Sequence, residues 1–183
     1  MKNNRIPHYT LYAIGLFLLD FVLTVFILSN NQIVTEANPL FYSHFGYVTL
    51  LINVLYLISI YLMTLCIKHY QTVMYDEKSS LAYFFKLYRS HHSFFIVVSV
   101  FSAYIKSTLV TRMFVVVEWL TFGIFEEAFL NSVYFTIRER FPLERFDVVF
   151  GFVLFVYFWL DWYRKEHLKA KELVRKSKAK ESI

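Results

Sequence analysis

Residues 9–29 read YTLYAIGLFLLDFVLTVFILS, an apolar run in which Asp20 is the only charged side chain. At a rise of about 1.5 Å per residue, a helix of this length crosses the roughly 30 Å hydrocarbon core of a bilayer. A carboxylate inside such a span is costly, and it therefore marks a candidate functional site. Thr24 follows Asp20 by four positions, so on a helix both side chains point to the same side. The stretch predicts a transmembrane helix that carries a polar site.

The whole chain has the composition of an integral membrane protein. Of its 183 residues, 57% are hydrophobic and 21% aromatic, which exceeds what the core of a soluble domain of this size needs. It contains only four glycines beside 21 phenylalanines and 14 tyrosines. We therefore expect interlocking aromatic side chains, rather than close glycine contacts, to pack the helices. The single cysteine, Cys66, excludes an intrachain disulfide and a cysteine-based metal site.

The expected fold is an all-α bundle of four transmembrane helices, with five as the open alternative. Residues 1–163 are predicted to form the transmembrane domain, with its spans at residues 9–29, 47–66, 94–122 and 143–163. The polar stretch 68–92 between the second and third spans is predicted to lie outside the membrane, as a loop with a short amphipathic helix.

Residues 164–183 form a basic tail that is predicted to continue the last span as a solvated helix. Glu166, Glu172 and several lysines recur there at helical spacing. We expect this tail to contact anionic lipid head groups. A nucleic-acid partner is not expected, because no aromatic or glycine-rich recognition element accompanies the basic residues.

The distribution of lysine and arginine favours four spans over five. Two basic residues precede the first span, none lies in the connection 30–46, four lie in 68–92, and eight follow Tyr163. With four crossings, the groups of two, four and eight all fall on the cytoplasmic side, as the positive-inside rule requires. With five crossings, the basic tail would lie outside. We therefore expect a multi-pass protein of the cell membrane with both termini in the cytoplasm.

Asp20 and Lys106 are predicted to face each other near the middle of the membrane. The first and third spans both run outward, and the two residues lie at similar distances from the starts of their spans. An ionised aspartate alone at this depth costs about 2.5–3.5 kcal/mol, which pairing with Lys106 would partly offset. The pair would then be a structural clamp, with Thr24 bonded to Asp20 or to a backbone carbonyl. The alternative is a carboxylate that responds to protons or ions.

The group Glu36-Ala37-Asn38-Pro39 in the connection after the first span has two interpretations. Asn38 can cap the segment that leads into the second span, and Glu36 then complements the helix dipole. Alternatively, Glu36, Asn38 and His44 form a binding site on the external face, with Asp20 below it.

The pattern Asp20-x3-Thr24, followed by Glu36-Ala37-Asn38-Pro39-Leu40 before a second hydrophobic span, resembles that of an uncharacterised family of small multi-pass membrane proteins. Members are found mainly in archaea and also in bacteria. The resemblance covers residues 18–40, with spacing that agrees onward to Cys66. It implies a four-helix membrane architecture and brings no assigned activity.

Glu118 is the remaining candidate residue, and we expect it to pair with Arg112 or with a neighbouring helix. The carboxylates of Glu126 and Glu127 follow it along the chain, but in the four-span topology they lie on the opposite side of the membrane from the histidine pair 91–92. A shared metal site is therefore excluded.

No cofactor is expected. All six histidines lie at or beyond the ends of the spans, so none is placed to be an axial haem ligand. The sequence also lacks a glycine-rich phosphate loop, a His-Glu-x-x-His helix and a serine nucleophile elbow.

The leading functional hypothesis is a non-enzymatic membrane protein. It would act as an accessory or assembly subunit, as part of a homo-oligomer or a larger membrane complex, or as a holder of a small ligand. The first alternative is an ion- or proton-coupled transporter that uses Asp20, Lys106 and Glu118. The second is a membrane-embedded enzyme that modifies lipids, with Glu36 and Asp20 as acid and base.

Overall fold

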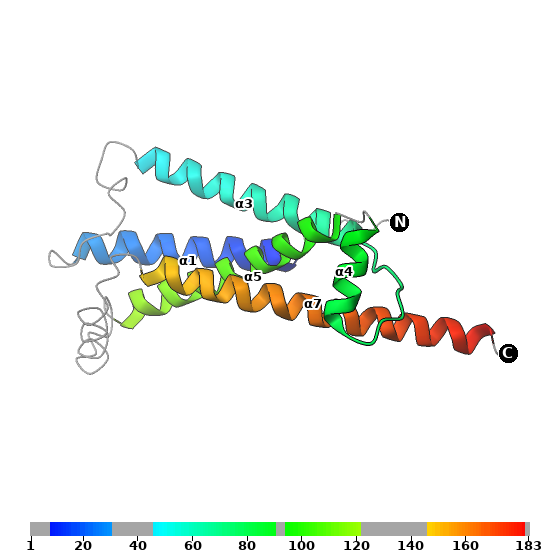
Figure 1. Cartoon of the computed structure of the whole chain (residues 1–183). Helices are drawn as coiled ribbons and strands as arrows, with labels where there is room; N and C mark the ends of the chain where they lie inside the picture. The colour runs from blue at the N-terminus through cyan, green and yellow to red at the C-terminus, as the bar shows by residue number, and fades with distance from the viewer. Residues whose placement is uncertain (1–7, 31–45, 91–93, 122–145, 182–183) are drawn as a thin grey trace. The chain divides into compact units, whose positions relative to one another are not determined.

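The computed structural model describes residues 8–30, 46–90, 94–121 and 146–181 (Figure 1). These residues contain no strand, and their five helices in chain order are α1 (His8–Asn30), α3 (Gly46–His69), α4 (Ser80–Arg89), α5 (Phe94–Trp119) and α7 (Phe146–Glu181). The predicted all-α class is therefore confirmed for this part of the chain.

Three of these helices are long and apolar enough to cross a membrane. The qualifying segments are His8–Ile27 of α1, Leu50–His69 of α3 and Phe94–Trp119 of α5. At about 1.5 Å per residue the three helices are roughly 35 to 39 Å long, which exceeds the ~30 Å hydrocarbon core. They agree to within a few residues with the first three predicted spans. The fourth predicted span overlaps the start of α7, which continues without a break to Glu181 (Figure 1).

The chain divides into two compact units, and the first comprises residues 1–62 and 108–152. In this unit Leu23 and Ile27 of α1 pack against Val116 of α5. Close contact between α5 and the start of α7 depends on Gly151. A Cβ atom at that position would lie 3.3 Å from the Thr111 Oγ1 atom, tighter than an ordinary van der Waals contact. A larger side chain at Gly151 would therefore require the Thr111 side chain to move by a few tenths of an ångström.

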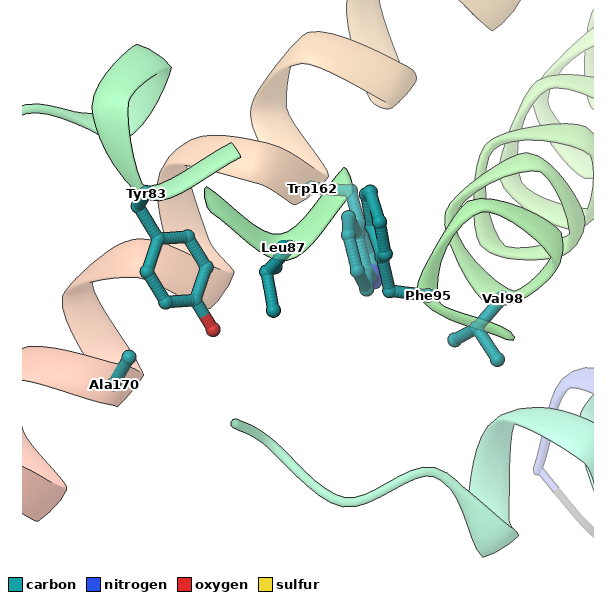
Figure 2. Packing of buried hydrophobic residues seen from close by; sticks show 6 residues of the cluster. All are labelled: Tyr83, Leu87, Phe95, Val98, Trp162 and Ala170. Carbon is teal, nitrogen blue, oxygen red and sulfur yellow. The ribbon is translucent and has the colours of Figure 1, made fainter. Parts of the chain in front are cut away.

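The second unit, residues 63–107 and 153–183, has an aromatic core. Figure 2 shows its buried side chains converging from three helices: Tyr83 and Leu87 of α4, Phe95 and Val98 of α5, and Trp162 and Ala170 of α7. The Tyr70 ring, just after α3, extends this core, with its centroid 5.9 Å from that of Trp162 and 6.3 Å from that of Phe94. Such ring pairs add about 0.5–1.5 kcal/mol each beyond the burial of apolar area.

Helix α4 is the short amphipathic helix predicted within 68–92. Ser79 caps its N-terminus, because the Ser79 Oγ atom accepts the Ala82 N–H at 3.1 Å. Ser90 caps the C-terminus of the helix, since its N–H donates to the Lys86 carbonyl at 3.0 Å. The Tyr83 hydroxyl donates to the Val73 carbonyl at 2.8 Å, which fixes segment 70–79 against α4.

The prediction that the tail is solvated is wrong for two residues of its first turn, whereas Arg164 and Lys165 of the same turn are exposed. Glu166 and His167 are buried, because segment 70–79 and α4 cover this part of α7. His167 Nε2 donates to the Glu77 carbonyl at 2.9 Å. Burial, together with the nearby Glu166 carboxylate, raises the pKa of Tyr70, so that its phenol stays neutral at physiological pH. The basic side chains of the tail, from Arg164 to Lys180, are exposed as the sequence predicts.

The aromatic core predicts a large difference between two leucine truncations in the second unit. Leu87 is 1% exposed and Leu168 is 56% exposed. We expect Leu87→Ala to lower the free energy of unfolding by about 2–5 kcal/mol, since it leaves a cavity. Leu168→Ala should change it by no more than about 0.5 kcal/mol. Thermal unfolding in detergent measures both variants, and equal losses would contradict the assignment of this core.

The ion pair between Asp76 and Lys178 predicts an effect of acid on segment 70–79. Lys178 Nζ lies 2.6 Å from Asp76 Oδ2, and the hydrogen bond and charge of Lys178 hold the pKa of Asp76 below its usual value. A carboxyl group with a depressed folded pKa stabilises the fold above its unfolded pKa, and that contribution is lost as the pH falls through the folded pKa.

Acidification through that range should therefore lower the protection of the amides in segment 70–79, measured as the hydrogen-exchange rate relative to the intrinsic rate at each pH. The effect should be weaker at high salt, because both side chains are exposed. Asp76→Asn should exchange faster at neutral pH and lose this acid dependence. Identical pH profiles for the two proteins would show that the ion pair does not hold the segment.

Candidate functional site

An ion pair joins α1 and α5 inside the first unit. Arg112 Nη1 donates to Asp20 Oδ2 at 2.6 Å. Both residues lie in segments apolar enough to cross a membrane. In low dielectric a charge-assisted hydrogen bond of this kind is considerably stronger than in water. Asp20 is therefore paired, as predicted, but with a different partner.

Helix α3 contributes to the same site. Arg112 Nη2 donates to Asn53 Oδ1 at 3.0 Å, and the guanidinium carbon lies 5.7 Å from the centroid of the Tyr56 ring. The Trp119 side chain, two turns further along α5, also interacts with the Asp20 carboxylate. We name Asp20, Arg112 and Asn53 the polar clamp, since one guanidinium links three helices.

The polar clamp is well shielded at its acidic end and less so at its basic end. The side chain of Asp20 is 13% exposed and that of Arg112 is 34% exposed. Long arginine side chains can keep part of the guanidinium near polar surroundings while their stems lie along apolar surface. Since the carboxylate and the guanidinium compensate each other, the clamp brings no net charge into the apolar layer.

The prediction that Lys106 is the partner of Asp20 is wrong. Its ammonium group lies 6.0 Å from the centroid of the Phe158 ring, and its charged neighbours are Asp161 and Lys165. The prediction assumed that the first and third spans begin at the same depth. Arg112 lies six residues beyond Lys106, so that assumption misplaced the two helices by about 9 Å along their axes.

The geometry of the arginine side chain also explains why an arginine, rather than a lysine, bonds both Asp20 and Asn53. A guanidinium presents several N–H groups in a rigid fork, so it can bond a carboxylate and an amide at the same time. A lysine ammonium offers a compact point charge on a flexible stem. The polar clamp needs two donors that point toward two different helices.

The other predicted site residues are only partly brought together. Thr24 is buried one turn after Asp20, beside Leu23 and Ile27. Glu118 is half-buried, and within the described ranges no ion pair joins it to Arg112, whose donors bond Asp20 and Asn53. Among the residues that the structure describes, no group of three or more His, Cys, Asp or Glu side chains is arranged to hold a metal ion. The predictions for Glu36, Asn38, His44, 91–92 and 126–127 lie outside the described residues.

Sequence reasoning missed Arg112 and Asn53 as members of the site, although a signal was present. Asn53 is the strongly polar residue of the second predicted span, and Arg112 is an arginine inside the third. Polar side chains in membrane helices bond across helices because lipid offers no alternative partner. A search for one such residue in each span would have grouped them with Asp20.

The polar clamp predicts a non-additive pair of substitutions. Either Asp20→Leu or Arg112→Met leaves one charge unpaired, and each should lower the free energy of unfolding by about 3–5 kcal/mol. The double variant removes both charges and should recover most of that loss. Unfolding of purified protein in detergent measures all three. Additive losses in the double variant would show that the two charges do not depend on each other.

Comparison with known proteins gives no match: no family model fits the chain, and no curated protein or solved structure is significantly similar to it. The resemblance of residues 18–40 to a family of small membrane proteins therefore stays a prediction.

Proposed function

We propose that this chain is a small multi-pass membrane protein that serves as a non-enzymatic accessory or assembly subunit. The observation that carries the proposal is the polar clamp, in which Arg112 bonds both Asp20 and Asn53. A carboxylate that is already bonded to a guanidinium fits a fixed contact between helices better than a group that must bind and release an ion.

The proposed topology has four crossings and both termini in the cytoplasm. Helices α1, α3 and α5 supply three crossings, and the apolar first half of α7 supplies the fourth. Large apolar side chains of that half are exposed, as lipid contact would require: Val148, Val149, Phe152, Val153, Tyr157 and Leu160. The basic groups before α1, after α3 and at the end of α7 then share the cytoplasmic side.

A rigid extramembrane module supports the accessory role. Helix α7 has 36 residues and is about 54 Å long, so its second half extends beyond the ~30 Å hydrocarbon core. Three contacts brace this half against segment 70–79: His167 to the Glu77 carbonyl, Lys171 to the Lys78 carbonyl, and Lys178 to Asp76. A braced helix with exposed basic side chains suits contact with anionic head groups and with an acidic surface of a partner subunit.

The transporter alternative requires Asp20, Lys106 and Glu118 to act together. Asp20 is bonded to Arg112, whereas Lys106 contacts Phe158 and lies near Asp161. These contacts favour two separate structural roles. The enzyme alternative depends on Glu36, which lies outside the described residues.

The decisive experiment compares the wild type with Asp20→Leu/Arg112→Met, the variant that lacks both charges of the polar clamp. We expect the full chain, extracted in mild detergent, to run as a complex of fixed stoichiometry in native mass spectrometry. The double variant should retain this complex, because it keeps the helix contacts and loses only the charges. In proteoliposomes, neither protein should dissipate a proton or cation gradient.

A gradient-driven flux through the wild type that the double variant abolishes would overturn the accessory role in favour of transport. Lys178→Glu is the matched control, since it reverses a charge outside the apolar segments. Vesicles that contain Lys178→Glu should keep a proton or cation gradient as well as vesicles that contain the wild type.

A further inference from the structure

Helix α4 carries apolar side chains on two faces, only one of which is covered. Tyr83 and Leu87 point into the core of the second unit (Figure 2). Leu81, Phe85 and Tyr88 are 71%, 71% and 68% exposed. A helix on the surface of a soluble protein would present polar side chains at such exposed positions.

The apolar arc of α4 is too wide for a helix that only covers a protein core. At about 100° per residue, Leu81, Phe85 and Tyr88 fall within roughly 60° of one another. Together with the buried residues and Phe84, they make an apolar arc of about 200°, whereas an arc of about 100° suffices to face a core. Lys86 and Arg89 occupy the remaining edge. The helix is therefore built to touch apolar material on two sides and water on one.

The position of α4 in the chain fixes its level at the membrane surface. It begins eleven residues after His69, the last residue of α3, and ends five residues before Phe94, the start of α5. A chain of five residues extends over at most about 18 Å, so the end of α4 lies within that distance of the start of α5, which is apolar enough to cross a membrane. Tyr70 and Trp162, aromatic residues of the kind enriched where a bilayer meets water, pack together in the same unit.

The charges around α4 suit an anionic bilayer. Lys68 at the end of α3 and Arg89 at the end of α4 are both exposed. Lys86 Nζ lies 2.6 Å from Glu77 Oε1 and 4.8 Å from the centroid of the Tyr75 ring. These two contacts keep the Lys86 side chain directed away from the exposed apolar face of α4. A helix with an apolar face and basic residues beside it binds in the plane of the bilayer interface.

We propose that α4 lies in the interfacial layer of the protein's own membrane, with Leu81, Phe85 and Tyr88 inserted among lipid acyl chains and Arg89 among anionic head groups. The experiment below distinguishes lipid on this face from a partner protein or a second copy of the chain. The proposal rests on the crossing of α3 and α5 and does not depend on the accessory role.

A nitroxide scan of α4 tests the proposal in the full-length protein. In a Cys66→Ser background, single cysteines replace Leu81, Phe85 and Tyr88 on the exposed face and Ala82 and Arg89 on the other edge. Each labelled protein is reconstituted in vesicles of phosphatidylethanolamine and phosphatidylglycerol. Electron paramagnetic resonance then measures how accessible each label is to oxygen, which partitions into lipid, and to a water-soluble nickel chelate.

Two further positions calibrate the scan. Ile58→Cys, on the exposed side of the apolar segment of α3, reports lipid, and Glu172→Cys, on the exposed part of α7, reports water. We expect the ratio of oxygen to nickel accessibility to be several-fold higher at residues 81, 85 and 88 than at 82 and 89, and to approach that of Ile58→Cys.

Two results would overturn the proposal. High nickel accessibility at all five positions of α4, with Ile58→Cys still in lipid, would place the helix in water while leaving the membrane topology intact. Low accessibility to both reagents at 81, 85 and 88 would show that protein, not lipid, covers this face. If Ile58→Cys itself reported water, the proposed crossing of α3 would fail as well.

Discussion

A charge placed in an apolar helix must find an opposite charge within the same layer, and the first unit is organised around this requirement. Asp20 cannot reach water along α1 without crossing apolar side chains, so its position along the helix constrains α5. Arg112 satisfies it, and the second guanidinium nitrogen extends the constraint to α3 through Asn53. Apolar contacts such as that of Leu23 and Ile27 with Val116 are tolerant of sliding, whereas this hydrogen-bonded set is not. The ion pair thus selects one register among several that apolar packing alone would permit.

The second unit is held together in a different way from the first. Its core contains aromatic rings from α4, α5, α7 and the segment after α3. Polar groups inside this core are tied to it as well: Ser99 is fully buried, accepts the Trp159 indole N–H at 2.9 Å and lies 3.1 Å from the Tyr163 hydroxyl. Large rings with few rotatable bonds lose little conformational entropy on burial, which suits a chain poor in glycine.

The helices were predictable because a long apolar run has few interpretations. The runs at 9–29 and 47–66 correspond to α1 and α3, and Phe94 begins the third predicted span and α5 alike. The partner of Asp20 was not predictable by the same route. Depth was counted from the start of each run, and a start carries an uncertainty of several residues, each worth about 1.5 Å. A choice between Lys106 and Arg112 required the ends of the spans to be known more precisely than hydropathy allows.

The burial of Glu166 and His167 was missed for another reason. Segment 70–79 folds back onto α7, and the spacing of residues within α7 carries no information about that contact.

Helix α7 runs without interruption from an apolar segment into a basic segment. From Val153 to Glu181 the helix passes from exposed apolar side chains to exposed basic ones with no break in its backbone hydrogen bonding. In the proposed topology, a change in bilayer thickness that displaces the apolar half of α7 along its axis would displace every basic side chain of the helix by the same distance. The bonds from Lys171 and Lys178 to segment 70–79 would resist that displacement. In that topology, one continuous helix would couple the thickness of the membrane to the position of the basic surface.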